Sequence, residues 1–100
     1  MIRLTTETQV MLALNPVDFR RGIDSLSGLC QYELKQNPRS GVLFVFVSRD
    51  KTKVRVLVYE ENGFWLMTKR LSSGRFSWPE STKQLSPATA GQLRKILSLK

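Results

Sequence analysis

The chain has 100 residues, with 16 Lys or Arg against 8 Asp or Glu, which gives a formal net charge of +8. This length fits one domain spanning residues 1–100, and a hydrophobic content of 41% is ordinary for a folded globular chain. An excess of cations favours polyanionic partners, nucleic acid first among them. Basic charge also serves solubility alone, so charge by itself identifies no partner.

Two residue types are scarce: the chain has no histidine and one cysteine, Cys30. Without histidine, the commonest general base and metal ligand is missing. A single cysteine forms no intrachain disulfide, which fits a reducing cytoplasm. No stretch approaches the roughly 20 apolar residues of a membrane span, and the N-terminus lacks the apolar run of a signal peptide. We therefore expect a cytoplasmic protein with no cofactor, no metal and no membrane contact.

The first half of the chain predicts a strand followed by a helix. Residues 10–14 form a short apolar run typical of a strand, and Asn15 then suits a helix N-cap. Over residues 16–35, Arg20 and Asp24 are spaced to pair across one helical turn. Apolar residues recur there at steps of three and four, which predicts one apolar stripe on Phe19, Ile23, Leu26, Cys30 and Leu34.

Three strand-like segments follow, over residues 42–47, 53–59 and 64–69. The first is continuously apolar, as expected of a strand buried on both faces, and the second alternates. The dipeptide Asn62-Gly63 between the last two is typical of a two-residue hairpin turn. With a turn over residues 48–52, these segments predict an antiparallel meander.

The C-terminal part predicts a loop and a helix. Residues 71–84 show no periodicity, and Ser86-Pro87 then suits the start of a helix. The complete order is strand, helix, three strands, loop, helix, which predicts an α+β fold: a mainly antiparallel sheet with a helix packed on one face. An exposed edge on the strand at residues 10–14 could pair with another copy, giving a homo-oligomer.

Catalytic chemistry is not indicated, because carboxylates are few and scattered. On a helix, Asp18 and Asp24 would lie about 240° apart around the axis, too divergent to share a metal ion. Glu60 and Glu61 flank the hairpin turn as surface residues. A two-metal nuclease or transposase site needs several converging carboxylates. We therefore predict no enzyme activity and no catalytic residues.

The hairpin carries a candidate nucleic-acid surface. A two-residue loop at Asn62-Gly63 would set Arg55 opposite Arg70, where like charges repel unless a phosphate lies between them. The hypothesis is that this face and the following loop contact nucleic-acid backbone. The alternative is a solvated sheet face with a different register. The predicted contacts are Lys53, Arg55, Lys69, Arg70 and Arg75.

Aromatic residues accompany these cations. Cations for phosphate with aromatics for exposed bases are a known combination for binding single strands. Large aromatics are more often buried, and this favours packing for Phe76 and Trp78 over base stacking. The residues predicted to stack or pack are Tyr59, Phe64, Phe76 and Trp78.

Three separated motifs carry a family resemblance: DFRRGIDSL at residues 18–26, PRSGVLFVF at 38–46 and KRLSSGRFSWP at 69–79. In this order they resemble the second-open-reading-frame accessory protein (TnpB) of a large bacterial insertion-sequence family, which is distinct from the RNA-guided nuclease of the same label. The resemblance runs over about residues 1–97. It implies a role in transposition beside a separate transposase that carries the catalytic acidic residues. One departure is Ser48-Arg49, where the family tends to have two arginines.

Three functions follow from these patterns. The first is a non-catalytic accessory factor for transposition that binds DNA. The second is an adaptor that docks on the transposase through an outward apolar patch of Leu57, Tyr59, Trp65 and Leu66. The third is a small basic ribonuclease toxin, against which the absence of histidine counts.

Overall fold

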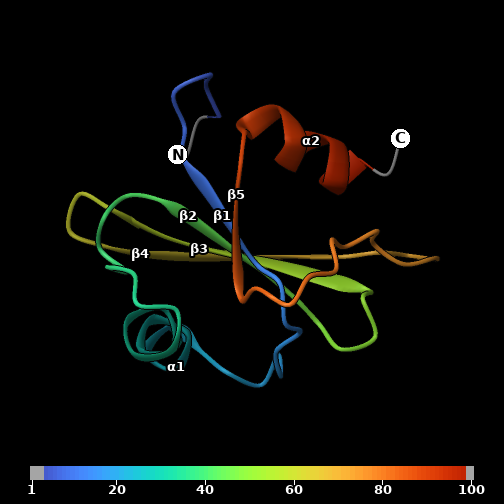
Figure 1. Ribbon diagram of the computed structural model, residues 1–100, viewed down its shortest axis with the longest axis horizontal. Helices are drawn as coiled ribbons and strands as arrows, with labels where there is room; N and C mark the ends of the chain where they lie inside the picture. The colour runs from blue at the N-terminus through green and yellow to red at the C-terminus, as the bar shows by residue number, and fades with distance from the viewer. Residues whose placement is uncertain (1–3, 99–100) are drawn as a thin grey trace.

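The computed structural model describes residues 4–98 and contains a five-stranded sheet in the order β4-β3-β2-β1-β5. β1 (Val10–Ala13) runs parallel to β2 (Leu43–Val47), and the other neighbouring pairs are antiparallel. One helix covers each face of the sheet, α1 below and α2 above in Figure 1. The predicted α+β fold with a mainly antiparallel sheet is confirmed. Residues 1–3, part of the segment that lacks a signal-peptide pattern, lie outside the described range.

β2, β3 (Lys53–Glu60) and β4 (Gly63–Arg70) form the predicted antiparallel meander. The turn between β2 and β3 is built on Asp50. Its carboxylate accepts hydrogen bonds from the Ser48 hydroxyl (2.8 Å) and from the Thr52 hydroxyl and amide (2.8 and 3.1 Å). These bonds favour the ionised carboxylate and lower the pKa of Asp50 from 3.8 to about 2.

The predicted register of the β3–β4 hairpin is wrong. Glu60 lies opposite Gly63, so residues 61–62 form the turn, with a φ of 59° at Glu61. Each residue of β3 therefore faces a β4 residue two positions earlier than expected. Arg55 and Arg70, predicted to oppose each other, are not paired.

Side-chain pairing across the two strands explains this register. Tyr59 lies opposite Phe64, and their rings meet edge to face with centroids 5.0 Å apart. Arg55 lies opposite Thr68, whose hydroxyl accepts a 2.8 Å hydrogen bond from its Nε. Aromatic pairs and hydrogen-bonded pairs stabilise a sheet, whereas the predicted register would set two arginines against each other.

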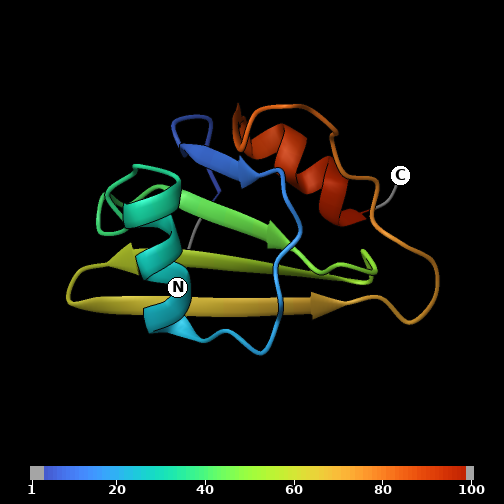
Figure 2. The ribbon, with the colours of Figure 1, turned by 60° about the horizontal axis from the view of Figure 1, so that its bottom comes forward.

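The helical segment is shorter than predicted. It consists of α1 (Ile23–Gly28) and a π-helical turn, η1 (Leu29–Glu33), so the helix start at Asn15-Pro16 is wrong. The chain before α1 is not helical because the Val17 amide donates to the Val47 carbonyl (3.0 Å), in a parallel bridge beyond the end of β2, and residues 18–21 then form a turn in which the Arg21 amide donates to the Asp18 carbonyl (3.2 Å). Figure 2 shows α1 lying across the strands after this segment.

The C-terminal region contains a strand that the sequence did not predict. β5 (Leu85–Ala88) occupies the expected helix start and pairs antiparallel with β1. β1 is therefore an interior strand, and its predicted exposed edge is wrong. α2 (Ala90–Ser98) begins later, after a capping box in which Thr89 Oγ1 accepts from the Gln92 amide (3.0 Å) and Gln92 Oε1 accepts from the Thr89 amide (2.8 Å).

Two apolar clusters hold the layers together, one on each face of the sheet. The α1 face packs Leu26, Leu29 and Cys30 against Phe44, Phe46 and Leu57. The α2 face packs Leu93 against Leu12, Val45, Val54, Val56, Phe76 and Trp78. Cys30 is fully buried, as predicted, and burial raises the pKa of its thiol to about 12. No helix within residues 4–98 is long and apolar enough to span a bilayer.

Candidate nucleic-acid interface

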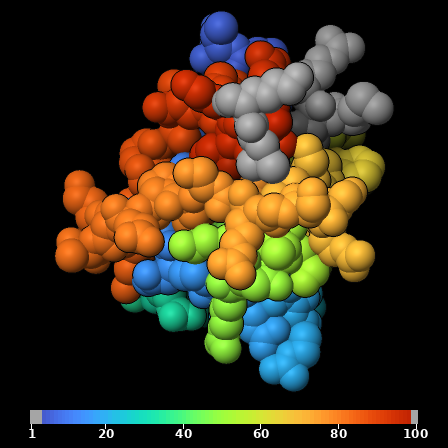
Figure 3. Space-filling model, turned by 90° about the vertical axis from the view of Figure 1, so that its right-hand side faces the viewer, coloured from blue at the N-terminus to red at the C-terminus, as the bar shows by residue number. Residues whose placement is uncertain are grey.

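Cations are concentrated at one end of the sheet, where β2 and β4 end and β3 begins. Figure 3 shows this side of the molecule, with the segment after β4 in orange beside the β2–β3 turn in green. Backbone hydrogen bonds build this end. The Leu71 amide donates to the Thr52 carbonyl (2.9 Å), and the Phe76 amide donates to the Lys51 carbonyl (2.7 Å). The segment after β4 is therefore folded against the β2–β3 turn. We call the cations collected here the basic rim: Arg20, Arg49, Lys51, Lys53, Arg70 and Arg75.

Register and loop positions bring the rim residues together. Lys53 lies directly opposite Arg70 on the paired strands. Arg20, Arg49 and Lys53 line one shallow depression of about 490 Å³, together with Arg55 and residues 17–19 of the segment before α1. The rim thus runs across the end of the sheet, from the α1 side to the segment that carries Arg75.

The acids near the rim are engaged locally. Asp18 accepts hydrogen bonds from the Arg20 guanidinium, the shortest at 2.7 Å, and from the Arg20 amide at 2.9 Å. These contacts lower the pKa of Asp18 from 3.8 to about 2. The predicted pairing of Arg20 with Asp24 is therefore wrong. Glu80 lies 3.8 Å from the Lys51 ammonium group.

Four rim cations remain available. Within residues 4–98, the side chains of Arg49, Lys53, Arg70 and Arg75 make no hydrogen bond or ion pair. Arg49, Arg70 and Arg75 are exposed, and Lys53 is half-buried. Unpaired cations at one exposed end of a domain are an electrostatic feature that attracts polyanions.

Arg55, a predicted contact, is engaged inside the protein. Its Nη1 donates to the carbonyls of Phe19 (2.9 Å) and Arg21 (3.0 Å), and its Nε donates to Thr68. The guanidinium also lies over the Phe19 ring, 4.5 Å from the centroid. Arg55 therefore fixes the turn at residues 18–21, before α1, onto the sheet.

Lys69, another predicted contact, lies on the opposite face of β4. Its Nζ donates to the Leu97 carbonyl (2.7 Å) in the last turn of α2. A cation near the C-terminus of a helix satisfies a free carbonyl and interacts favourably with the helix dipole. The five predicted contacts thus do not form one available surface. Lys53, Arg70 and Arg75 belong to the rim and make no hydrogen bond, whereas Arg55 borders the same depression as Lys53 but is bound to backbone carbonyls, and Lys69 is bound to α2 on the other face.

The four predicted aromatics lie away from the rim surface. Phe76 and Trp78 are buried, at 2% and 7% exposure, and the Trp78 indole donates to the Ala13 carbonyl (3.1 Å). Tyr59 and Phe64 lie at the opposite end of the hairpin, beside its turn. None of the four adjoins the rim with an exposed ring.

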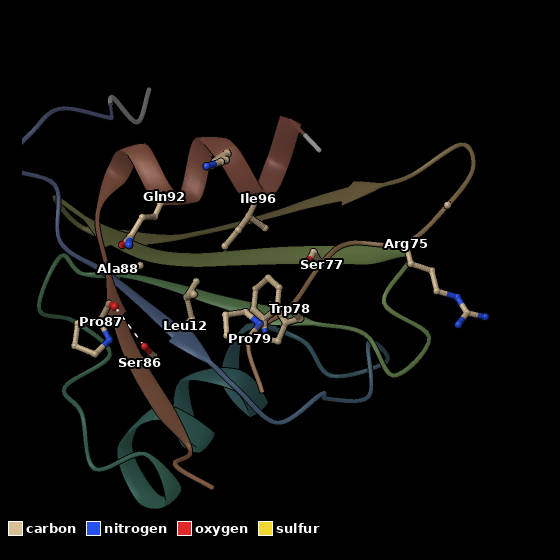
Figure 4. Close-up of a pocket in the computed structure, with 12 residues that line it drawn as sticks. Leu12, Arg75, Ser77, Trp78, Pro79, Ser86, Pro87, Ala88, Gln92 and Ile96 are labelled. Carbon is tan, nitrogen blue, oxygen red and sulfur yellow. Dashed lines mark hydrogen bonds between the residues drawn. The ribbon is translucent and has the colours of Figure 1, made fainter. Parts of the chain in front are cut away.

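A groove of about 810 Å³ lies between α2, β5 and the segment that follows the rim (Figure 4). Leu12, Trp78 and Pro79 form its floor, with Gln92 and Ile96 of α2 above them. The Arg75 guanidinium points away from the other lining side chains. Arg75 thus belongs to the rim more than to the groove.

The apolar patch expected of an adaptor is not formed. Leu57 was predicted to face outward but is completely buried under α1. Leu66 and Tyr59 are half-buried on that same face, whereas Trp65 lies on the other face and is 49% exposed. The four residues therefore do not form one exposed surface.

Acidic and sulfur ligands also stay apart. Within residues 4–98, no three Asp, Glu, Cys or His side chains lie close enough together to hold a metal ion. Asp18 lies in the turn at residues 18–21, and Asp24 lies in α1, so the two carboxylates are not on one helix as the sequence predicted.

Comparison with known proteins places the chain in a family. The model of the family described as "IS66 Orf2 like protein" matches residues 8–98. The chain belongs to the IS66 Orf2-like family. Membership supports an accessory role associated with an insertion sequence, and it confirms the resemblance carried by the three sequence motifs.

Two proteins of Sinorhizobium fredii are similar to this IS66 Orf2-like chain. The uncharacterized protein y4hO is 38% identical over 90 residues, which cover 90% of this chain and 78% of y4hO. The uncharacterized protein y4jC is 38% identical over 71 residues, covering 71% of this chain and 61% of y4jC. No solved structure matches the chain.

Two of the three motifs of this IS66 Orf2-like protein contribute cations to the basic rim. The motif at residues 18–26 supplies Arg20 and is bound by Arg55, and the motif at 69–79 supplies Arg70 and Arg75. Three rim residues were not among the predicted contacts: Arg20, Arg49 and Lys51. Arg49 and Lys51 lie in the β2–β3 turn. Their position in the turn after β2 could have indicated them, because that turn lies at the same end of the meander as the end of β4.

Proposed function

We propose that this IS66 Orf2-like protein binds nucleic acid through the basic rim and serves in transposition as a non-catalytic accessory factor beside the transposase. The observation that carries the proposal is a set of four cations at one end of the sheet whose side chains make no hydrogen bond or ion pair within residues 4–98: Arg49, Lys53, Arg70 and Arg75. Arg49 and Lys53 act on the carboxylates of Asp18 and Asp50 only through space. The nearby carboxylates of Asp18 and Asp50 are held by local hydrogen bonds. Both carboxylates stay ionised, and with Glu80 beside Lys51 they offset three of the six rim cations, which leaves an excess of three positive charges at the rim.

The rim favours phosphate over bases. It is built from turns and strand ends, and no helix within residues 4–98 contributes a residue to it, so the rim lacks the helix that a DNA groove reader inserts. The predicted aromatics are buried or distant, which argues against stacking of single-stranded bases. We therefore expect binding with little sequence preference, dominated by backbone contacts and strongly dependent on salt.

The test is binding of the purified protein to labelled duplex and single-stranded DNA across a salt series, read by fluorescence anisotropy. The rim variant carries Arg49→Gln, Arg70→Gln and Arg75→Gln. Its slope of log affinity against log salt should fall by about 2 to 3, since each lost phosphate contact removes about 0.9.

A matched control removes three cations elsewhere: Lys35→Gln, Arg39→Gln and Lys95→Gln. Lys35 and Arg39 lie between η1 and β2, and Lys95 lies on α2. Because net charge falls equally in both variants, an equal loss of affinity would show that binding follows overall charge, and the rim would be rejected. No binding by the parent protein at low salt would reject the nucleic-acid proposal. Capture of the transposase without DNA would then support an adaptor.

A further inference from the structure

The two edges of the sheet differ in how they are protected. The outer strands are β4, with eight residues, and β5, with four. β5 contains Pro87, which offers no amide hydrogen to an approaching strand. β4 contains no proline, and no lysine before Lys69. Short length and proline are the usual means of preventing edge-to-edge pairing, and only β5 uses them.

The free backbone groups of β4 follow from the register. Glu60 pairs with Gly63 across the two-residue turn, and beyond the strand the Leu71 amide still donates toward β3 at Thr52. Odd-numbered residues of β4 therefore direct their backbone groups to β3. The even-numbered residues direct theirs to the open edge, where four amides and four carbonyls stand in a row: Phe64, Leu66, Thr68 and Arg70.

Apolar side chains flank this edge. Trp65 and Met67 are 49% and 39% exposed, unusual values for large hydrophobic residues in this protein. Met67 also borders an apolar cavity of about 250 Å³, lined further by Val54, Val56 and Leu93. Pairing along β4 would cover both exposed side chains.

The charges on the hairpin select the partner and its direction. Lys69 and Arg70 lie at the end of β4, and Glu60 and Glu61 lie at the turn before its start. An antiparallel second copy would bring each cationic end beside the acidic turn of its partner. A parallel copy would place like charges together.

We propose that β4 pairs antiparallel with β4 of a second copy, about a two-fold axis near Leu66 and Met67, to form a homodimer with a continuous ten-stranded sheet. The same patch then meets itself, as a two-fold symmetric interface requires. Arg70 belongs both to the basic rim and to this charge pairing. The Thr68→Pro variant described below changes no rim cation, so it separates the outcome of this inference from that of the proposed function.

The first test is the mass of the intact protein, measured by sedimentation equilibrium across a concentration series. A monomer has 11.5 kDa, and the dimer has twice that mass, 23 kDa. We expect reversible association to the dimer and no larger species. A monomer at every concentration would overturn the proposal.

The second test blocks the edge. Thr68→Pro removes an amide that points away from β3, and proline is tolerated at such edge positions. The matched control is Thr68→Val, which equally loses the hydroxyl that accepts from Arg55. We expect the proline variant to be a folded monomer by circular dichroism and sedimentation, and the valine variant to dimerise. A proline variant that still dimerises would overturn the proposal.

A charge exchange keeps the proposal testable should the proline variant not fold. Glu61→Arg alone and Arg70→Glu alone should each weaken dimerisation at least tenfold, because each creates a like-charged contact across the axis. The double variant should restore it. Additive weakening in the double variant would contradict the antiparallel arrangement.

Discussion

Arg55 and Arg70 lie on the same face of one hairpin, and their surroundings differ completely. Arg55 is covered by the segment before α1 and donates three hydrogen bonds to protein oxygens. Arg70 stands at the exposed end of β4 opposite Lys53. Two arginines on one face of a hairpin can therefore have different roles: Arg55 stabilises the fold, and Arg70 is available to a ligand.

Other cations follow the same division. Lys69 donates to the Leu97 carbonyl, and Arg94 donates to the Leu4 carbonyl (2.6 Å). The formal net charge of +8 therefore overstates what the protein offers to a polyanion. We expect DNA affinity to depend on the cations of the rim and not on the total net charge of the protein.

The largest expected effect comes from removing the internal cation. Arg55→Ala should lower the free energy of unfolding by about 2–3 kcal/mol, since charged hydrogen bonds are lost and two carbonyls are left without a donor. The measurement is chemical denaturation. In the absence of denaturant, where the Arg55→Ala variant is still folded, it should bind DNA with nearly the same affinity as the parent protein.

Arg55→Lys is the control for charge. Lysine keeps the positive charge but lacks the planar fork that reaches two carbonyls and one hydroxyl, so most of the destabilisation should persist. A lysine variant as stable as the parent protein would show that charge alone, and not hydrogen-bond geometry, explains the role of Arg55.

A smaller effect is expected at Lys69. Lys69→Gln should destabilise the protein by about 0.5–1 kcal/mol, the size of a cation's interaction with a helix C-terminus. Denaturation at low and high salt provides the measurement, and salt should reduce the difference. A marked loss of DNA affinity instead would move Lys69 into the binding surface.

Releasing a rim residue should strengthen binding slightly. Asp18→Asn removes the carboxylate that engages Arg20 at 2.7 Å. DNA affinity should rise by about two- to fivefold at low salt, the size of one charge interaction through water. Anisotropy against the parent protein measures the change. Weaker binding would mean that Asp18 is needed to position Arg20.

The smallest effect concerns pH. The pKa of Asp50 is lowered from 3.8 to about 2 by hydrogen bonds from Thr52 and Ser48. Its stabilising contribution is therefore complete above about pH 4 and is lost as pH falls through about 2. The difference in melting temperature between the parent protein and Asp50→Asn should stay constant from pH 7 to 4 and shrink below that. A difference that shrinks already at pH 6 would contradict this assignment.

The sequence predicted well what depends on local pattern. The apolar run at β2, the alternation in β3 and the turn over residues 48–52 each appear as expected. The helix start failed because a tertiary contact, the Val17 amide on Val47, overrides local propensity. β5 was missed because four residues, LSPA, carry no periodicity, and pairing with β1 alone makes them a strand.

The site was predicted in part for a similar reason. Lys53, Arg70 and Arg75 were predicted from the hairpin and the loop after it, and all three lie at the rim, although the register used to predict Arg70 was wrong. The role of Arg55 could not be recognised, because its partners Phe19 and Arg21 are more than 30 residues away in sequence. Only the folded chain shows which arginines already have acceptors.

The most direct test of the rim is a titration of the ¹⁵N-labelled protein with duplex DNA, followed through the arginine Nε–Hε signals. We predict that Arg49, Arg70 and Arg75 shift on binding and lose their shifts at high salt, while the Arg55 signal, fixed on Thr68, stays in place. Shifts at Arg55 with none at the rim arginines would contradict the division of cations on which the account rests.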